Sequence, residues 1–326
     1  MINDSECVTF EEALVRLADE DVPLSSPVLY ALSGLSSEEV RLFRRQWPTL
    51  SLERRRKIIA LLAESAEANF ELDFNDLFRV TMTDEDEQVR TVSIEGLWED
   101  DEVTLIAPLV HALRHDTAVS VRAAAASSLG RFVLMAELEE LDERYACSIR
   151  AALLETIGNK GEHVEVRRRA VESIAYLGKD YVREIIAAAY QEAEESMRIS
   201  AIFAMGRSAD KSWARIVQSE LSNANPAIRY EAVRACGELE VKEAVPALIR
   251  LASDPDREVQ FAAIAALGQI GGTRARRFLE RCCRSKDEIV RLAAEDALAE
   301  LEWGQQPLDL FIYEVNEEEN IEPEEY

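Results

Sequence analysis

The sequence predicts an all-α fold that is built as a row of about seven or eight helical hairpins. First, a motif of the form Val-Arg-x-x-Ala-x-x-x-Leu-Gly recurs with 31 residues between copies, and its second position, the anchor, is occupied by Arg198, Arg229, Gln260 and Arg291. Self-similarity at a fixed period of this size is the signature of a repeat array. Second, no stretch alternates apolar and polar residues long enough to form a β-strand.

Residues 1–50 are irregular and predict a helical cap at the N-terminal end of the array. Thr9 followed by Glu12 forms a capping box at the start of a helix, and Ser36 begins another. Pro27 is expected to break the chain between these two helices.

Residues 51–304 are predicted to form the array itself. Earlier anchors stand at Arg90, Arg122 and Arg167, and the wider gap of 45 residues between the last two predicts an insertion of about 14 residues. We expect that insertion between 132 and 145, where it extends a helix. Each repeat then consists of a variable first helix and a second helix that carries the anchor. A glycine eight residues after several anchors allows the neighbouring helix to approach closely.

Composition restricts the class of partner. The chain of 326 residues has 37 Lys and Arg against 63 Asp and Glu, which gives a net charge of −26. Such a charge disfavours nucleic acid and anionic membrane surfaces as ligands. Five cysteines without a CxxC pair are typical of a reducing compartment. We expect no signal peptide and no membrane span, and therefore a soluble cytoplasmic protein.

No group of residues predicts catalysis, a cofactor or a metal site. His111 and His115 are four residues apart but lack the glutamate of an HExxH zinc motif. The acidic runs at 84–87 and 99–102 are expected to be solvated carboxylates at helix starts. We therefore expect the protein not to be an enzyme.

The recurring motif resembles HEAT repeats, and most closely the short bacterial type named after the phycobilisome (PBS) lyases. The resemblance spans about residues 72–303, with Gln260 in place of an anchor arginine and Trp98, Ala175 and Ala299 in place of the glycine. It implies a right-handed α-solenoid, armadillo- or HEAT-like, whose second helices line a concave binding surface. Enzymatic members of this family include bilin lyases, which act on tetrapyrrole-carrying proteins. The anchor arginines are expected to bond acidic or carbonyl groups of adjacent turns.

Helical geometry predicts which residues of the second helices face a partner. At about 100° per residue, the positions one, two, five and nine after the anchor lie opposite the core face. Position one is apolar or aromatic in four successive repeats, which is typical of an interaction surface. The predicted partner-binding residues are Tyr176, Ile199, Phe203, Tyr230, Phe261 and Leu292, flanked by Arg168, Arg169, Arg207 and Arg234.

The sequence therefore predicts a noncatalytic scaffold, adaptor or assembly factor that binds a protein or an acidic peptide. Two alternatives would instead cover or bury the predicted surface, namely burial in a tightly curled core or coverage by a dimer or by the chain's own tail. The tail, residues 305–326, is acidic and is expected to be flexible. A subunit of a bilin lyase is the enzymatic alternative.

Overall fold

The computed structural model describes residues 8–303, which form helices and no β-strand. The expected tail, 305–326, lies outside the described residues. Contacts divide the chain into two compact units, Met1–Leu239 and Glu240–Tyr326. An all-α solenoid arrangement, as the sequence predicted, is found in the paired helices of each unit.

The first unit begins with short helices that precede the regular pairs. They are α1 (Phe10–Ala18), α2 (Ser26–Tyr30), α3 (Ser37–Gln46), the 3-10 turn η1 (Trp47–Thr49) and α4 (Leu52–Ala68). The capping box of Thr9 and Glu12 is present at α1, and a second one joins Ser36 and Glu39 at α3. Pro27 lies in the first turn of α2. Backbone N–H groups in a first turn have no acceptor within the helix, so a proline there breaks no helical hydrogen bond. The structure therefore has a short helix, α2, at the place where the sequence predicted a break.

Five helical pairs follow in the first unit. They are α5 (Asn75–Thr81) with α6 (Glu87–Gly96), η2 and α7 (Val103–Leu105, Ile106–His115) with α8 (Val119–Glu137), α9 (Glu143–Gly158) with α10 (Val164–Ile174), α11 (Asp180–Tyr190) with α12 (Glu195–Arg207), and η3 and α13 (Lys211–Trp213, Ala214–Glu220) with α14 (Pro226–Glu238). The predicted insertion lengthens α8 to 19 residues.

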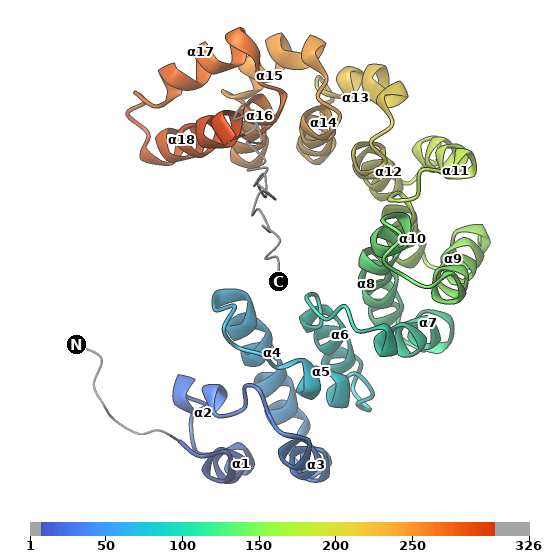
Figure 1. Ribbon diagram of the computed structural model, residues 1–326, viewed down its shortest axis with the longest axis vertical. Helices are drawn as coiled ribbons and strands as arrows, with labels where there is room; N and C mark the ends of the chain where they lie inside the picture. The colour runs from blue at the N-terminus through green and yellow to red at the C-terminus, as the bar shows by residue number, and fades with distance from the viewer. Residues whose placement is uncertain (1–7, 304–326) are drawn as a thin grey trace, which may run out of the picture. The chain divides into compact units, whose positions relative to one another are not determined.

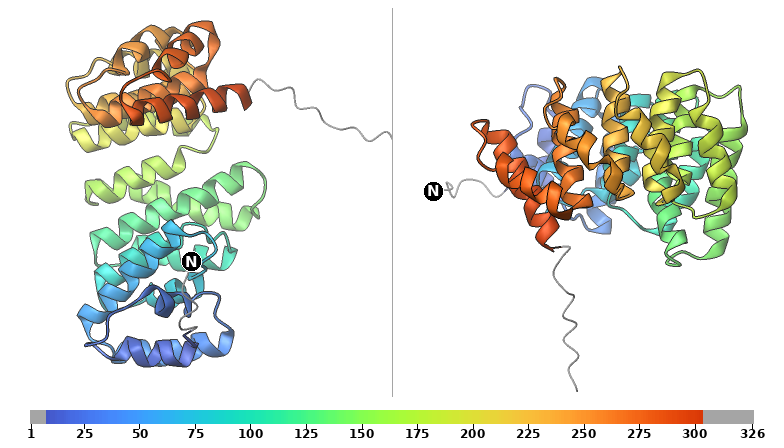
Figure 2. Two further views of the ribbon diagram at one scale, coloured as in Figure 1. Left: turned by 90° about the vertical axis from the view of Figure 1, so that its left-hand side faces the viewer. Right: turned by 90° about the horizontal axis from the view of Figure 1, so that it is seen from above.

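The second helices of these pairs pack against one another in order and form an inner layer, from α4 through α6, α8, α10 and α12 to α14. The first helices, such as α7, α9 and α11, cover the outer side of that layer (Figure 1). In the left view of Figure 2 the helices of this unit lie across the page and stack one above another. Within residues 8–239, no helix covers the other face of the inner layer.

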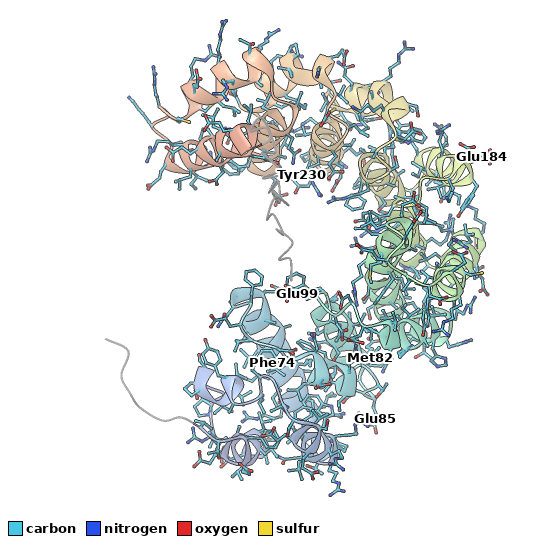
Figure 3. The ribbon with its side chains drawn as sticks, in the orientation of Figure 1. Phe74, Met82, Glu85, Glu99, Glu184 and Tyr230 are labelled. Atoms are coloured by element: carbon cyan, nitrogen blue, oxygen red, sulfur yellow. The ribbon has the colours of Figure 1, made fainter. Side chains whose placement is uncertain are left out.

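Apolar side chains fill the space between the layers. Phe74 and Met82 are buried there, at 2% and 7% exposure, whereas the glutamates labelled in Figure 3 on the outer side, Glu85 and Glu184, are exposed. α8 has the length and hydropathy of a membrane span, but a core helix of a water-soluble protein passes the same test. Half of α8 is buried, and it packs against α6, α7, α9 and α10.

The second unit contains two further pairs of the same kind. They are η4 and α15 (Lys242–Ala244, Val245–Leu251) with α16 (Arg257–Ile270), and α17 (Gly272–Cys282) with α18 (Glu288–Trp303). The close approach expected at the motif glycine is observed here, because a Cβ atom built on Gly268 would lie 2.6 Å from the carbonyl oxygen of Ala297. The glycine thus lets α16 and α18 pack closely.

Candidate functional site

The anchor arginines of the first unit join neighbouring repeats. Four of them pair with an acidic residue in the following hairpin, over N–O distances of 2.5 to 2.8 Å: Arg90 with Asp116, Arg122 with Glu162, Arg167 with Glu192, and Arg198 with Glu220. Arg90 and Arg122 also donate hydrogen bonds to carbonyl oxygens of the turn that precedes their own helix. These arginines are therefore structural, as the sequence predicted.

The uncovered face of the inner layer contains a groove with a volume of about 610 Å³. Four consecutive second helices, α8, α10, α12 and α14, supply its walls. Its lining residues are Ser127, Gly130, Arg131, Leu134, Arg168, Arg169, Glu172, Ser173, Tyr176, Ile199, Phe203, Glu231 and Arg234.

The groove follows the predicted helical positions closely. Every lining residue except Gly130, Leu134 and Ser173 stands one, two, five or nine residues after its anchor. The same register therefore places successive side chains on one continuous surface. The structure brings together six of the ten predicted partner-binding residues at this groove: Tyr176, Ile199, Phe203, Arg168, Arg169 and Arg234.

Two more predicted residues lie beside the groove. The guanidinium of Arg207 is 5.3 Å from the ring centre of Phe203, and that of Arg234 is 5.7 Å from the ring centre of Tyr230. Both distances are within the range of cation–π attraction. Tyr230 and Arg207 thus extend the same surface.

The last two predicted residues belong to the second unit. Leu292 on α18 is 52% exposed. Phe261 on α16 is half-buried beneath the guanidinium of Arg257, at 4.8 Å from its ring centre. Each remains a candidate surface residue of its own unit.

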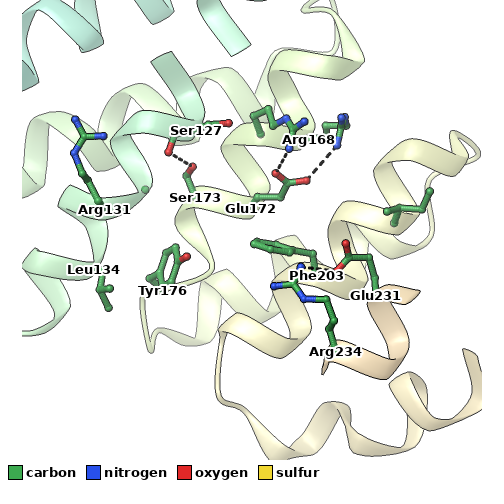
Figure 4. A pocket seen from close by; sticks show the side chains of 13 residues that line it. Ser127, Arg131, Leu134, Arg168, Glu172, Ser173, Tyr176, Phe203, Glu231 and Arg234 are labelled. Atoms are coloured by element: carbon green, nitrogen blue, oxygen red, sulfur yellow. Dashed lines mark hydrogen bonds and ion pairs between the residues drawn. The ribbon is translucent and has the colours of Figure 1, made fainter. Parts of the chain in front are cut away.

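Three apolar or aromatic side chains on the groove wall are half-buried. Tyr176, Ile199 and Phe203 are neither core residues nor fully exposed ones. In Figure 4, Leu134 and Tyr176 lie on the side of α8 and α10, and Phe203 lies on the side of α12. Aromatic side chains that keep part of their surface in a concave site are well suited to bind an apolar group.

Three of the four arginines that line the groove have glutamate partners. Arg168 donates two hydrogen bonds of 2.6 and 2.8 Å to Glu165, and Arg169 donates to Glu165 and Glu172 at 3.1 and 2.9 Å. Arg234 is an ion-pair neighbour of Glu231 at 3.6 Å. The flanking positive charge expected from the sequence is thus largely neutralised within the protein.

The glutamates beside Arg234 lie in a poorly solvated environment. Burial raises the pKa of Glu231, against the opposing effect of Arg234, and burial likewise raises the pKa of Glu238. Arg207 lies 3.5 Å from Glu238. This end of the groove therefore holds a compact, internally paired group of charges.

Arg131 differs from the other arginines of the groove, and the sequence-based selection missed it. Its Nε donates to the carbonyl oxygen of Asp100 at 2.9 Å and its Nη1 to Ser128 Oγ at 2.7 Å. Its Nη2 is buried without a hydrogen-bond partner, and no described carboxylate forms an ion pair with it. Burial lowers the pKa of Arg131 to about 10.

The register of the repeat could have identified Arg131. It stands nine residues after Arg122, the same place that Tyr176 occupies after Arg167. An arginine in a groove lining whose charge no carboxylate of the protein neutralises attracts a carboxylate of a ligand by that charge.

Other chemistry is not supported by the described residues. Within 8–303, no group of three or more His, Cys, Asp and Glu side chains is arranged to hold a metal ion. His111 and His115 lie on α7 with ring centres 4.8 Å apart.

Comparisons with known proteins agree with this architecture. A family model described as HEAT repeats matches residues 214–299. No curated protein matches the sequence significantly. Among solved structures, the complex of CpcE and CpcF of phycocyanin lyase from Nostoc sp. PCC7120 is 14% identical, covers 92% of this chain and 97% of that chain, and has a TM-score of 0.52. At this identity the similarity shows the fold alone.

Two further structures have lower TM-scores. Importin beta is 14% identical, covers 90% of this chain and 44% of that chain, and has a TM-score of 0.46. A designed armadillo repeat protein is 19% identical, covers 60% of this chain and 99% of that chain, and has a TM-score of 0.39.

Proposed function

We propose that this α-solenoid, whose residues 214–299 match HEAT repeats, binds a partner polypeptide in the groove between α8 and α14 without catalysing a reaction. In this proposal it serves as a scaffold, adaptor or assembly factor in the cytoplasm, and needs no cofactor. The observation that carries the proposal is the row of half-buried Tyr176, Ile199 and Phe203 along a groove of about 610 Å³.

The chemistry of the groove supports a segment that combines an apolar and an acidic side chain. Tyr176 and Phe203 offer aromatic surface, which contributes most where it is desolvated by a partner. Arg131 offers the one guanidinium in the groove lining that has no glutamate partner. The preference for an acidic partner therefore depends on Arg131 more than on the arginines selected from the sequence.

A capture experiment tests the proposal. Full-length protein is immobilised and exposed to lysate of its native host, in parallel with Tyr176→Ser and Phe203→Ser variants. Tyr181→Ser, at an exposed site on α11, is the matched control. We expect the two groove variants to lose a defined protein that the control retains, with all variants folded by circular dichroism. Equal capture by folded groove variants would refute the groove as the binding site.

The chain's own tail is the competing occupant, and deletion tests it separately. If residues 305–326 occupied the groove, then their removal would increase capture by the wild-type groove. Unchanged capture after the deletion leaves the external partner as the occupant.

The similarity to the CpcE–CpcF complex over 92% of this chain favours one enzymatic alternative. A bilin lyase subunit would bind a tetrapyrrole, and the purified protein incubated with a phycobilin would become coloured. A spectrum identical to the sum of the separate components would argue against this activity.

A further inference from the structure

Two aromatic side chains form an exposed pair away from the core of the first unit. Phe70 follows the end of α4 and Trp98 follows the end of α6. Their ring centres are 6.3 Å apart in an edge-to-face arrangement, yet Phe70 is 74% exposed and Trp98 is 45% exposed. A pair of large rings that touch each other but remain in solvent is unusual for a face with no partner.

Trp98 occupies a position where later repeats need a small residue. It stands eight residues after the anchor Arg90, as Gly206 does after Arg198. At Gly206 an added Cβ would lie 3.0 Å from the Cα of Ala235, so the glycine allows helix packing. α6 has already ended at Gly96, and Trp98 is therefore directed away from helix packing toward solvent.

Both rings are held by ordered turns. Asn69 Oδ1 accepts a hydrogen bond of 3.0 Å from the amide of Glu71, which closes the turn that carries Phe70. The turn that carries Trp98 is fixed through Asp100, whose carboxylate accepts two bonds of 2.6 Å from Arg79 and whose carbonyl accepts one from Arg131. The pair is thus a preformed surface, which lowers the entropy lost on binding.

The two chain segments that carry the pair are acidic in composition. No lysine or arginine occurs in 58–78 or in 91–113. The exposed carboxylates within three residues of either ring in the sequence are Glu67, Glu71, Asp73, Glu95, Glu99 and Asp101. Burial raises the pKa of Glu95 on α6, Arg169 acts to lower it, and Glu67 on α4 adds to the rise.

We propose that the Phe70–Trp98 pair is a second docking surface, separate from the groove, that takes a basic segment of a partner protein. A lysine or arginine side chain of that segment lies against the rings by cation–π attraction. The flanking glutamates attract the other basic side chains of that segment. A second copy of this chain is disfavoured as the occupant, because each copy has a net charge of −26.

Fluorine NMR of the full chain tests this proposal. The chain contains four tryptophans, so labelling with 5-fluorotryptophan gives a small set of resonances. The resonance that disappears in Trp98→Phe belongs to Trp98. The probe is a short capped peptide of arginine, leucine and alanine, titrated at about 150 mM salt to screen long-range attraction. We expect the Trp98 resonance to shift, and a peptide with glutamate in place of arginine to leave it unmoved.

Variants separate the aromatic pair from the general charge. Phe70→Ala and Trp98→Ala should each weaken binding of the arginine peptide about fivefold, and Trp98→Phe should retain most of the affinity. Tyr30→Ala, at another exposed aromatic residue, is the matched control and should have no effect. Affinity that is equal in wild type and Trp98→Ala would overturn the proposal. Sedimentation that shows a dimer lost in Trp98→Ala would overturn it in favour of self-association.

Discussion

Arg122 on α8 binds Glu162 through two hydrogen bonds of 2.8 and 3.1 Å, although 40 residues separate them. The equivalent pair one repeat earlier, Arg90 and Asp116, is separated by only 26 residues. The difference equals the insertion that the anchor spacing predicted. The lengthened α8 and α9 therefore carry the extra residues while the contact between neighbouring hairpins is kept.

Replacing Arg122 with alanine should lower the free energy of unfolding by about 2–3 kcal/mol, because it leaves Glu162 without its main partner in a largely desolvated place. The two side chains are only 16% and 15% exposed. Urea denaturation measures the change. Arg122→Lys should recover only part of the loss, since lysine cannot form both bonds. A loss below about 0.5 kcal/mol would place this pair with ordinary surface ion pairs.

Acid should weaken the same contact. Burial acts to raise the pKa of Glu162, but hydrogen bonds from Arg122 and from the amide of His163 outweigh it and hold the pKa below its usual value. A carboxylate with a lowered folded pKa stabilises the protein above its unfolded pKa, and that stability is lost as the pH falls through the folded value. The difference in unfolding free energy between wild type and Glu162→Gln should therefore reach its maximum above about pH 5 and decrease below about pH 4. A pH-independent difference would contradict this assignment.

Gly206 and Gly158 offer a matched pair of glycine-to-alanine substitutions. A Cβ atom at Gly206 would lie 3.0 Å from the Cα of Ala235, whereas a Cβ at Gly158 meets nothing within 4 Å. Gly206→Ala should destabilise the fold by about 1–3 kcal/mol, because α12 and α14 must move apart. Gly158→Ala, at the end of α9, should be neutral or stabilise by up to about 1 kcal/mol. Thermal unfolding of both variants distinguishes packing from helix propensity.

Arg131→Met should separate binding from stability. The lowered pKa of Arg131 means that the unfolded chain holds this proton more tightly than the folded protein does, so the charge destabilises the fold at pH 7. Removal of the charge stabilises the variant, and loss of the two hydrogen bonds of Arg131 destabilises it. Its unfolding free energy should therefore stay within about 1 kcal/mol of wild type, while capture of a groove partner falls. Arg150→Met, whose side chain pairs with Glu143 on α9, is the control and should keep full capture.

Cysteine reactivity should report burial directly. Cys147 is exposed, whereas Cys236 is buried and its burial raises the pKa of the thiol to about 12. Only the thiolate reacts, so alkylation of Cys236 near pH 8 should be at least about 1,000-fold slower than that of Cys147. Peptide mass spectrometry after a short iodoacetamide pulse measures both rates. In denaturant the two rates should converge, and fast labelling of native Cys236 would show that α14 opens readily.

Much of the fold and of the groove was accessible from the sequence, because one repeated register sets both. The spacing of Arg198 and Arg229 located the helical pairs, and the same spacing placed Tyr176, Ile199 and Phe203 on the uncovered face. These are local properties of a helix with a fixed period. The register of the repeat therefore predicted which side chains lie on the uncovered face.

Charge partners were not accessible in the same way. The pairing of Arg168 with Glu165, and the lack of an acidic partner for Arg131, depend on side-chain directions and on a turn 31 residues earlier in the chain. The contact between Phe70 and Trp98 joins two irregular turns, to which no helical period applies. Such tertiary pairings follow from the assembled structure and not from the repeat.

The anchor ion pairs of the first unit have a mechanical consequence. Each of them ties one hairpin only to the next, as Arg90 does with Asp116 and Arg198 with Glu220. A tension applied to the two ends of such a unit loads these links in series, so the weakest joint yields first while the rest hold. Stretched in an optical trap, the protein would lengthen in several modest steps and not in one abrupt rupture.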